Sequence, residues 1–235
     1  MPKNSTGAQP VGQQRLWSRI IGHRALIVST LQAFSGQVAL SLFNFGLNLF
    51  LIRILPPAEY GVYAFACVCG LRAMYVNGAL VAAPLMVHAA ACEPLQARDE
   101  LETRLYALNT LIAVATFAVA LGYALVQYGE GPGGGIPIMV TFGIYVVAFM
   151  QRQLTRCAAY ARQRPGVACI GDLSVVALGG LALMAGWIAA AGLGVGFVLL
   201  VLAVANGCVS MMEMRLLGLR LVAPLIERTT GFCRL

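Results

Sequence analysis

Six long apolar segments, separated by short polar, proline-rich or glycine-rich connections, run through the chain from residue 26 to residue 216. A helical crossing of the hydrocarbon core of a bilayer needs about 20 apolar residues, and each segment has about this length or more. Backbone N–H and C=O groups in lipid must be paired within the crossing element, so each segment is expected to be an α-helix. Only 11% of the residues are charged, against about 25% in soluble domains. The sequence therefore predicts an all-α integral membrane protein with a six-transmembrane-helix bundle.

The connections set the ends of the expected spans and divide the chain into three regions. Because the connections are short, neighbouring spans are expected to be antiparallel. The six spans are expected over about 26–52, 59–88, 104–128, 136–156, 167–191 and, from 192 or 193, to 215. Residues 1–25 are expected to be a cytoplasmic, amphipathic segment whose helix lies on the inner membrane surface, 26–216 the bundle, and 217–235 a basic cytoplasmic tail.

The basic residues gather on one side of these spans. With the N-terminus placed inside, fourteen of the sixteen Lys and Arg residues fall on the cytoplasmic side, Arg53 falls outside and Arg72 lies within the second span. Cytoplasmic loops of membrane proteins carry an excess of Lys and Arg. We therefore expect both termini in the cytoplasm. The basic residues, including Arg152 and Arg156 before the fifth span, are interpreted as topology signals and not as a nucleic-acid site.

The sequence contains no pattern of catalytic residues that points to an enzyme. The HExxH, Walker A and GxSxG motifs are missing from the sequence. The seven cysteines are scattered, and Cys67 and Cys69 would point about 200° apart on a helix, which suits no shared metal. We therefore expect no enzyme activity, no catalytic residue, no metal site and no cofactor.

The first span carries a stripe of polar side chains along one helical face. Gln37, Ser41, Asn44 and Asn48 follow the spacing i, i+4, i+7, i+11, which keeps them on one side for about three turns. Polar side chains in hydrocarbon need partners. Two compatible interpretations stay open: hydrogen bonds to a neighbouring helix, or the lining of a hydrated path for a polar substrate.

Two charged residues lie inside the spans. Arg72 is about 20 Å from either end of the second span. A lipid-facing Arg at that depth costs at least about 2.5–3.5 kcal/mol, so Arg72 is expected to face the bundle, a partner or water. It would either contact helix carbonyls or Asn44, Asn48 or Asn77, or attract an anionic substrate. Asp172, about two turns into the fifth span, would form an ion pair with an Arg, the favoured interpretation, or couple transport to protons.

Residues 37–65 resemble the start of the polysaccharide-type flippases of the MOP superfamily. These proteins open with a polar first helix, an R-x-L turn, a short acidic-Tyr-Gly element and then a second helix. The matching residues are Arg53, Leu55, Glu59, Tyr60, Gly61 and Tyr63. The run 151–162, followed by Asp172, resembles their fourth-to-fifth helix region, and the resemblance covers about 32–220. In this element Pro56 and Pro57 end a helix, Glu59 suits the start of the next, and Gly61 permits close packing.

This resemblance implies export of lipid-linked oligosaccharides across the bacterial inner membrane for polysaccharide assembly. Such flippases have two six-helix lobes around a cationic, hydrated cavity and work by alternating access; the chain corresponds to the N-terminal lobe. The implied partners are membrane lipid, the lipid-linked oligosaccharide, glycan-assembly proteins, and a homodimer copy or a second half-transporter. The cavity candidates are Gln37, Ser41, Asn44, Asn48, Arg72 and Asn77. The alternative is a non-transporting membrane scaffold or a truncated remnant of such a flippase.

Overall fold

The computed structural model describes residues 11–88, 95–128, 135–189 and 194–219, and this part of the chain is helical throughout, apart from short turns. Six helical stretches within it are long and apolar enough to cross a membrane. They cover 27–54, 57–88, 98–123, 137–161, 165–188 and 195–217. The prediction of an all-α, six-helix membrane protein is confirmed at this level.

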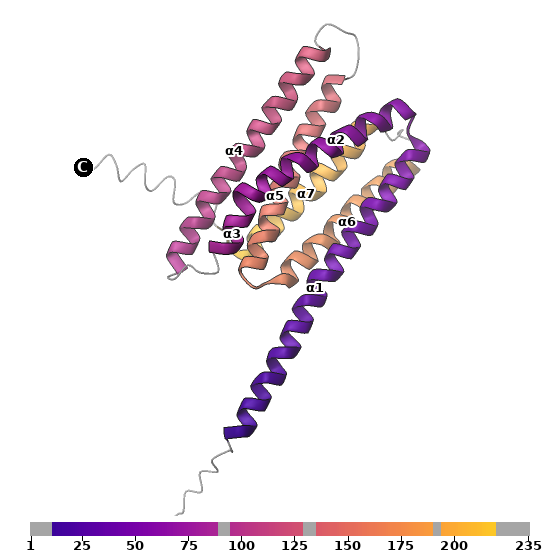
Figure 1. The fold of residues 1–235 in the computed structure, drawn as a ribbon. Helices are drawn as coiled ribbons and strands as arrows, with labels where there is room; N and C mark the ends of the chain where they lie inside the picture. Colours follow the sequence, from indigo (N-terminus) through magenta and orange to yellow (C-terminus); the bar gives the residue numbers. More distant parts are fainter. Residues whose placement is uncertain (1–10, 89–94, 129–134, 190–193, 220–235) are drawn as a thin grey trace, which may run out of the picture.

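The first helix, α1 (Val11–Ile54), is a single continuous element that extends well beyond the bundle (Figure 1). The helix ends before Pro56 and Pro57, since proline has no N–H to continue the ladder of hydrogen bonds. Pro57 then starts α2 (Pro57–Asn77), where the missing N–H costs nothing.

The second span is built from three consecutive helical pieces. After α2 the chain passes through a π-helical turn, η1 (Gly78–Ala82), and continues as α3 (Ala83–His88). Pro84 gives a local reason for this turn, because its ring clashes with the carbonyl one turn earlier and it lacks an N–H. The N–H of Ala83 bonds to the carbonyl of Gly78, five residues back, which keeps the span continuous.

The remaining helices are α4 (Leu95–Tyr128), α5 (Gly135–Ala161), α6 (Pro165–Ile188) and α7 (Val195–Leu217). Helix α5 runs five residues beyond the end expected at Arg156, because its arginines are accommodated inside the bundle. Helix α7 ends at Gly218, whose φ of 67° is favourable for glycine. The N–H groups of Gly218 and Leu219 close the helix on the carbonyls of Arg215 and Met214.

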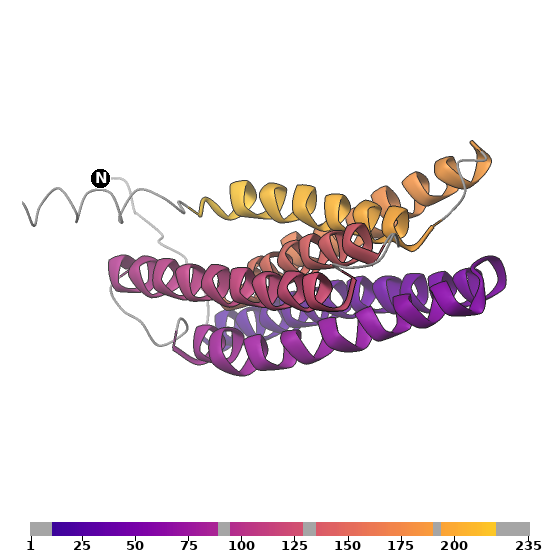
Figure 2. The same cartoon turned by 90° about the horizontal axis from the view of Figure 1, so that it is seen from above.

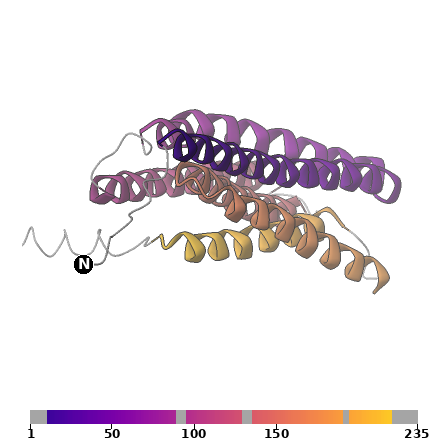
Figure 3. The same ribbon diagram turned by 90° about the horizontal axis from the view of Figure 1, so that it is seen from below.

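Helices α4, α5, α6 and α7 pack on one another and form what we call the packed body. Helices α1 and α2 form a second, less buried part, which we call the open layer. Helices α1 and α2 lie in one layer and diverge from the turn that joins them (Figure 1), with α7 on the opposite side of the bundle (Figures 2 and 3). A core cluster that includes Leu51, Val146 and Leu199 joins α1, α5 and α7 near the α1–α2 turn. A second, around Leu85 and Leu154, lies toward the other end. Half of the last span is buried but only 11% of the first, so α1 is the peripheral helix.

Candidate functional site

The most concentrated polar chemistry lies where α1, α5, α6 and α7 meet, about 6–15 Å inside the ends of their spans. Helix α5 supplies Arg152 and Arg156, which share one face at the spacing i, i+4. Both guanidinium groups reach Asp172 on α6. Arg152 pairs with Asp172 Oδ1, and Arg156 Nη2 lies 3.2 Å from Oδ2. Because Asp172 is fully buried and Arg152 is 1% exposed, the carboxylate is neutralised within the protein.

Two glycines allow the helices to approach these carboxylates. A Cβ atom added to Gly36 on α1 would lie 2.6 Å from Asp172 Oδ2. A Cβ on Gly171 of α6 would overlap Glu213 Oε1 on α7. Small residues let membrane helices pack closely, and here they also make room for acidic side chains between the helices. The packing and the buried charges are therefore parts of one arrangement.

The cluster extends to α7 and to α1 through two further hydrogen bonds. Glu213 is fully buried, and its Oε2 accepts a hydrogen bond from the Thr155 hydroxyl. Its Oε1 has no hydrogen-bond partner among the described residues. Arg156 Nη2 also donates to Gln37 Oε1 over 2.6 Å, and its guanidinium lies 5.7 Å from the centre of the Tyr160 ring. We call Gln37, Arg152, Thr155, Arg156, Asp172 and Glu213 the charged cluster.

A separate chain of amides joins the second span to α4 and α5. Asn77 Nδ2 donates to Asn109 Oδ1 over 2.7 Å, and Asn109 Nδ2 donates to Gln151 Oε1 over 2.8 Å. Asn77 and Asn109 are 3% and 0% exposed. Asn77, predicted to lie with the substrate path, is therefore buried between helices, where it acts as an interhelical contact.

The polar stripe of α1 is divided between these environments. All four residues are exposed, but only Gln37 bonds to another helix, through Arg156, and so belongs to the charged cluster. Asn48 Nδ2 bonds back to the carbonyl of Asn44 over 2.7 Å. The stripe lies beside the face that packs on α6, where Phe43 faces two glycines of that helix. Three of its four residues are therefore left open in the described part of the chain.

Arg72 makes none of the contacts expected for it. It is exposed, and neither a hydrogen bond nor an ion pair joins it to another described residue. Gly70, two residues earlier, is buried and faces α5, which places Arg72 about 200° round α2 from that side. Its guanidinium therefore points away from the bundle near the middle of the second span.

The residues that carry the family resemblance lie around the α1–α2 turn. Arg53 and Gly61 are exposed, while Glu59 and Tyr60 are half-buried in the first turn of α2. The ring of Tyr60 lies 6.2 Å from that of Tyr63. The expectation that Gly61 permits close packing is wrong, because a Cβ added there would meet no described atom within 4 Å.

Arg162, just beyond the end of α5, forms a second ionic cluster there. Its Nε donates to Glu102 Oε1 over 3.1 Å, and its Nη1 donates to the carbonyl of Leu217 over 2.7 Å. Arg98 lies 3.2 Å from the same Glu102 carboxylate, which is 2% exposed. The hydrogen bond to Glu102 raises the pKa of Arg162 above its usual value. This cluster ties α4 to the ends of α5 and α7.

Sequence reasoning missed most of the charged cluster, although a signal was present. Arg152 and Arg156 were interpreted as loop residues, yet they lie within α5. In an antiparallel hairpin, residues equally far from the turn lie at the same depth. Arg152 and Arg156 precede Gln163 by eleven and seven residues, and Asp172 follows it by nine. This register predicts that Asp172 lies between the two arginines.

No family model, curated protein or solved structure matches this chain. The resemblance to polysaccharide-type flippases therefore rests on the sequence motifs alone. Among the described residues, no three His, Cys, Asp or Glu side chains are grouped as they would be to hold a metal ion.

Proposed function

We propose that this protein is a transporter of the polysaccharide-type flippase kind in a bacterial inner membrane. It would translocate lipid-linked oligosaccharides, with both termini in the cytoplasm. The six apolar helices and the motif around Arg53, Glu59, Tyr60 and Gly61 support this proposal. The proposed translocation path follows the open layer of α1 and α2.

The observation that carries the proposal is the exposed Arg72 in the middle of the second span. An Arg facing lipid at that depth is unfavourable, so the guanidinium needs water, an anion or another polypeptide. A lipid-linked oligosaccharide offers a phosphate for Arg72 and sugar hydroxyls for the exposed Ser41, Asn44 and Asn48. The chemistry of this layer therefore suits a substrate that is both anionic and rich in hydroxyl groups.

The same layer supports assembly with a second lobe. Only 11% of the first span and 22% of the second are buried in one copy of the chain. Exposed polar groups on both helices favour a covered, hydrated interface over contact with lipid. We propose that a second copy of the chain, or a second half-transporter, supplies the other wall of the path.

In this proposal the charged cluster positions α1 against the packed body. Arg156 on α5 bonds both to Gln37 on α1 and to Asp172 on α6. One arginine of the packed body therefore helps to hold α1 in place. Alternating access requires helices that change their relative positions while the rest of the lobe remains packed. The first span is the least buried of the six, so α1 is the helix best suited to that movement.

Arg72 can be tested by complementation of a bacterial strain that lacks its oligosaccharide flippase. We expect the wild-type chain, with its partner lobe if that is a separate protein, to restore surface polysaccharide. We expect Arg72→Ala to lower export at least about tenfold at equal membrane levels, and Arg72→Lys to keep part of it, because the charge remains. Arg24→Ala is the matched control, since Arg24 is also exposed but precedes the first span.

Two results would contradict this proposal. Normal export by Arg72→Ala would remove Arg72 from the mechanism. A wild-type chain that reaches the membrane but restores no export in strains with different saccharides would favour the non-transporting scaffold.

A further inference from the structure

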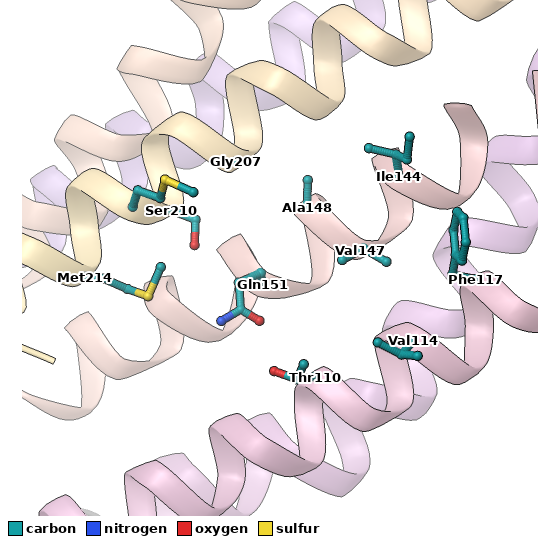
Figure 4. A pocket seen from close by; sticks show the side chains of 11 residues that line it. Thr110, Val114, Phe117, Ile144, Val147, Ala148, Gln151, Gly207, Ser210 and Met214 are labelled. Atoms are coloured by element: carbon teal, nitrogen blue, oxygen red, sulfur yellow. The ribbon is translucent and has the colours of Figure 1, made fainter. Parts of the chain in front are cut away.

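An elongated pocket of about 540 Å³ lies between α4, α5 and α7 (Figure 4). None of its lining residues comes from α1, α2 or α6, so it is separate from the proposed translocation path. It is lined by Thr110, Val114, Phe117, Ile144, Val147, Ala148, Gln151, Gly207, Ser210, Met211 and Met214. We call it the lipid-facing groove, because the three helices around it are membrane spans.

The polar residues of this lining gather toward one end of the groove, beside Met214, and the other end is apolar. Figure 4 shows Thr110, Gln151 and Ser210 toward one end and Phe117 and Ile144 toward the other. From Gln151 to Ile144 the groove follows α5 for seven residues, about 10 Å. The polar end lies nearer the end of the bundle where α5 and α7 finish. A ligand that fits this groove has a hydrogen-bonding part near that membrane surface and a hydrocarbon part that runs inward.

Ser210 gives the strongest indication that a ligand is bound here. Its side chain is 1% exposed, yet its hydroxyl has no hydrogen-bond partner among the residues that the structure describes. The hydroxyl points into the groove (Figure 4). Gln151 accepts a hydrogen bond from Asn109 through Oε1, and no hydrogen bond of its Nε2 is found in the described ranges. The Thr110 hydroxyl donates to the carbonyl of Tyr106, so Ser210 and the Gln151 Nε2 are the donors left without acceptors, which suits a ligand that carries acceptor oxygens.

A positive charge lies beyond the polar end of the groove. Arg215 is in the last turn of α7 and is exposed, and it forms no ion pair with a described residue. It follows Met211 by four residues and therefore lies on the same face of the helix as that part of the groove. From the membrane surface inward, the order is a cation, hydrogen-bond donors and an apolar channel.

We propose that this groove binds one acyl chain of an anionic glycerophospholipid. The phosphate would lie near Arg215, an ester carbonyl would accept hydrogen bonds from Ser210 and Gln151, and the chain would run past Val147 to Ile144. A long isoprenoid phosphate also combines phosphate and hydrocarbon, but it has no carbonyl between them for the buried donors. The site is independent of the proposed transport activity.

The test uses the full chain reconstituted with ester-linked phosphatidylglycerol and phosphatidylcholine in equal amounts, then released in mild detergent for native mass spectrometry. We expect the wild-type chain to retain one phosphatidylglycerol about tenfold more often than phosphatidylcholine. Gly207→Leu should lower this retention at least about tenfold, because a Cβ on Gly207 meets no described atom within 4 Å and the larger side chain fills the groove. Gly122→Leu is the matched control, with similar open space but outside the groove.

Ser210→Ala isolates the carbonyl contact without adding bulk. We expect it to weaken retention of ester-linked phosphatidylglycerol several-fold but to leave ether-linked phosphatidylglycerol, which lacks the carbonyls, unchanged. Equal retention by Gly207→Leu and Gly122→Leu would overturn the site. Equal retention of the two ester lipids would overturn the anionic headgroup, and retention of a polyprenyl phosphate as tight as that of phosphatidylglycerol would overturn the acyl-ester assignment.

Discussion

Polar side chains in the packed body are buried and paired, whereas several of those in the open layer are exposed and have no partner among the described residues. In the body, Asp172 is fully buried and is held by Arg152 and Arg156, and Asn109 bonds on both sides to neighbouring helices. In the open layer, Arg72 and Asn44 are exposed, and no side-chain partner is found for them in the part of the chain that the structure describes.

This difference separates two uses of polarity inside a membrane. Buried polar groups that satisfy one another can hold helices together without any further partner. Exposed polar groups in a span are unfavourable until water, a ligand or another polypeptide meets them. The helix contacts of the body are therefore made largely by pairs within one chain, whereas the exposed polar groups of the open layer require something outside it. Substitutions in the body should change stability, and those in the open layer should change activity.

The largest effect is expected from Asp172→Leu in the body. This change leaves Arg152, only 1% exposed, without its carboxylate. Removing one partner of a buried ion pair typically costs about 3–5 kcal/mol, because the remaining charge is uncompensated. The free energy of unfolding in a titration from mild detergent into SDS, followed by circular dichroism, measures this loss.

The double variant Arg152→Leu/Asp172→Leu is the control for that prediction. Replacing both members of a buried pair by apolar residues is often close to neutral, so part of the lost stability should return. Arg156 still lacks its acid in the double variant, so recovery is expected to be incomplete. A double variant as unstable as Asp172→Leu would show that the Arg152 charge is not the cause.

A smaller loss, of about 1–3 kcal/mol, is expected for Gly171→Ala, since overpacking a close helix contact forces neighbouring groups to move. The new methyl group would overlap Glu213 Oε1. Gly61→Ala is the matched control in the open layer and should be neutral, because its Cβ meets no described atom within 4 Å. Combining Gly171→Ala with Glu213→Ala should remove the clash. If Gly171→Ala costs the same in both backgrounds, Glu213 is not its obstacle.

The sequence predicts the helices better than it predicts their contacts. Apolar length and proline positions locate the six spans, since both act along the chain. The expected end at Arg156 was too early because a charge normally ends a span, whereas here Asp172 on the next helix compensates it. The depth of Asp172 could be predicted, but which of its neighbours it meets depends on how the helices pack.

The role of a single polar or small residue depends on whether its side of the helix packs against a neighbouring helix. Asn77 is buried and Asn44 is exposed, although both lie within apolar spans. Gly171 is in close contact with Glu213, whereas Gly61 has open space around it. Both glycines are near an acidic residue in the sequence, Asp172 and Glu59 respectively. Residue type and spacing are alike within each pair, so only the packing of the bundle separates them.

An intermediate effect is expected from Arg162→Gln at the end of the body. The change removes the hydrogen bonds to Glu102 and to the carbonyl of Leu217, while Arg98 continues to face the carboxylate. Hydrogen bonds to charged groups contribute about 1.5–3 kcal/mol, and the retained Arg98 places the expected loss at the lower end. Arg164→Gln, which removes one exposed contact of 3.4 Å to a carbonyl, should change stability by less than about 0.5 kcal/mol. Equal losses in the two variants of the SDS titration would contradict a special role for Arg162.

The smallest change in stability is expected in the open layer, where two asparagines allow a direct comparison. Asn44→Ala should shift the free energy of unfolding by less than about 0.5 kcal/mol, because the Asn44 side chain is exposed and no partner is found for it among the described residues. Asn109→Ala should cost about 1–3 kcal/mol, because it leaves both Asn77 Nδ2 and Gln151 Oε1 without a partner. Export should show the reverse order once corrected for membrane levels, with the larger loss in Asn44→Ala. In that case the export activity of Asn109→Ala is lowered by poorer folding, and that of Asn44→Ala by a lost contact with the substrate. A large loss of stability in Asn44→Ala would contradict this and would place Asn44 in the packed body.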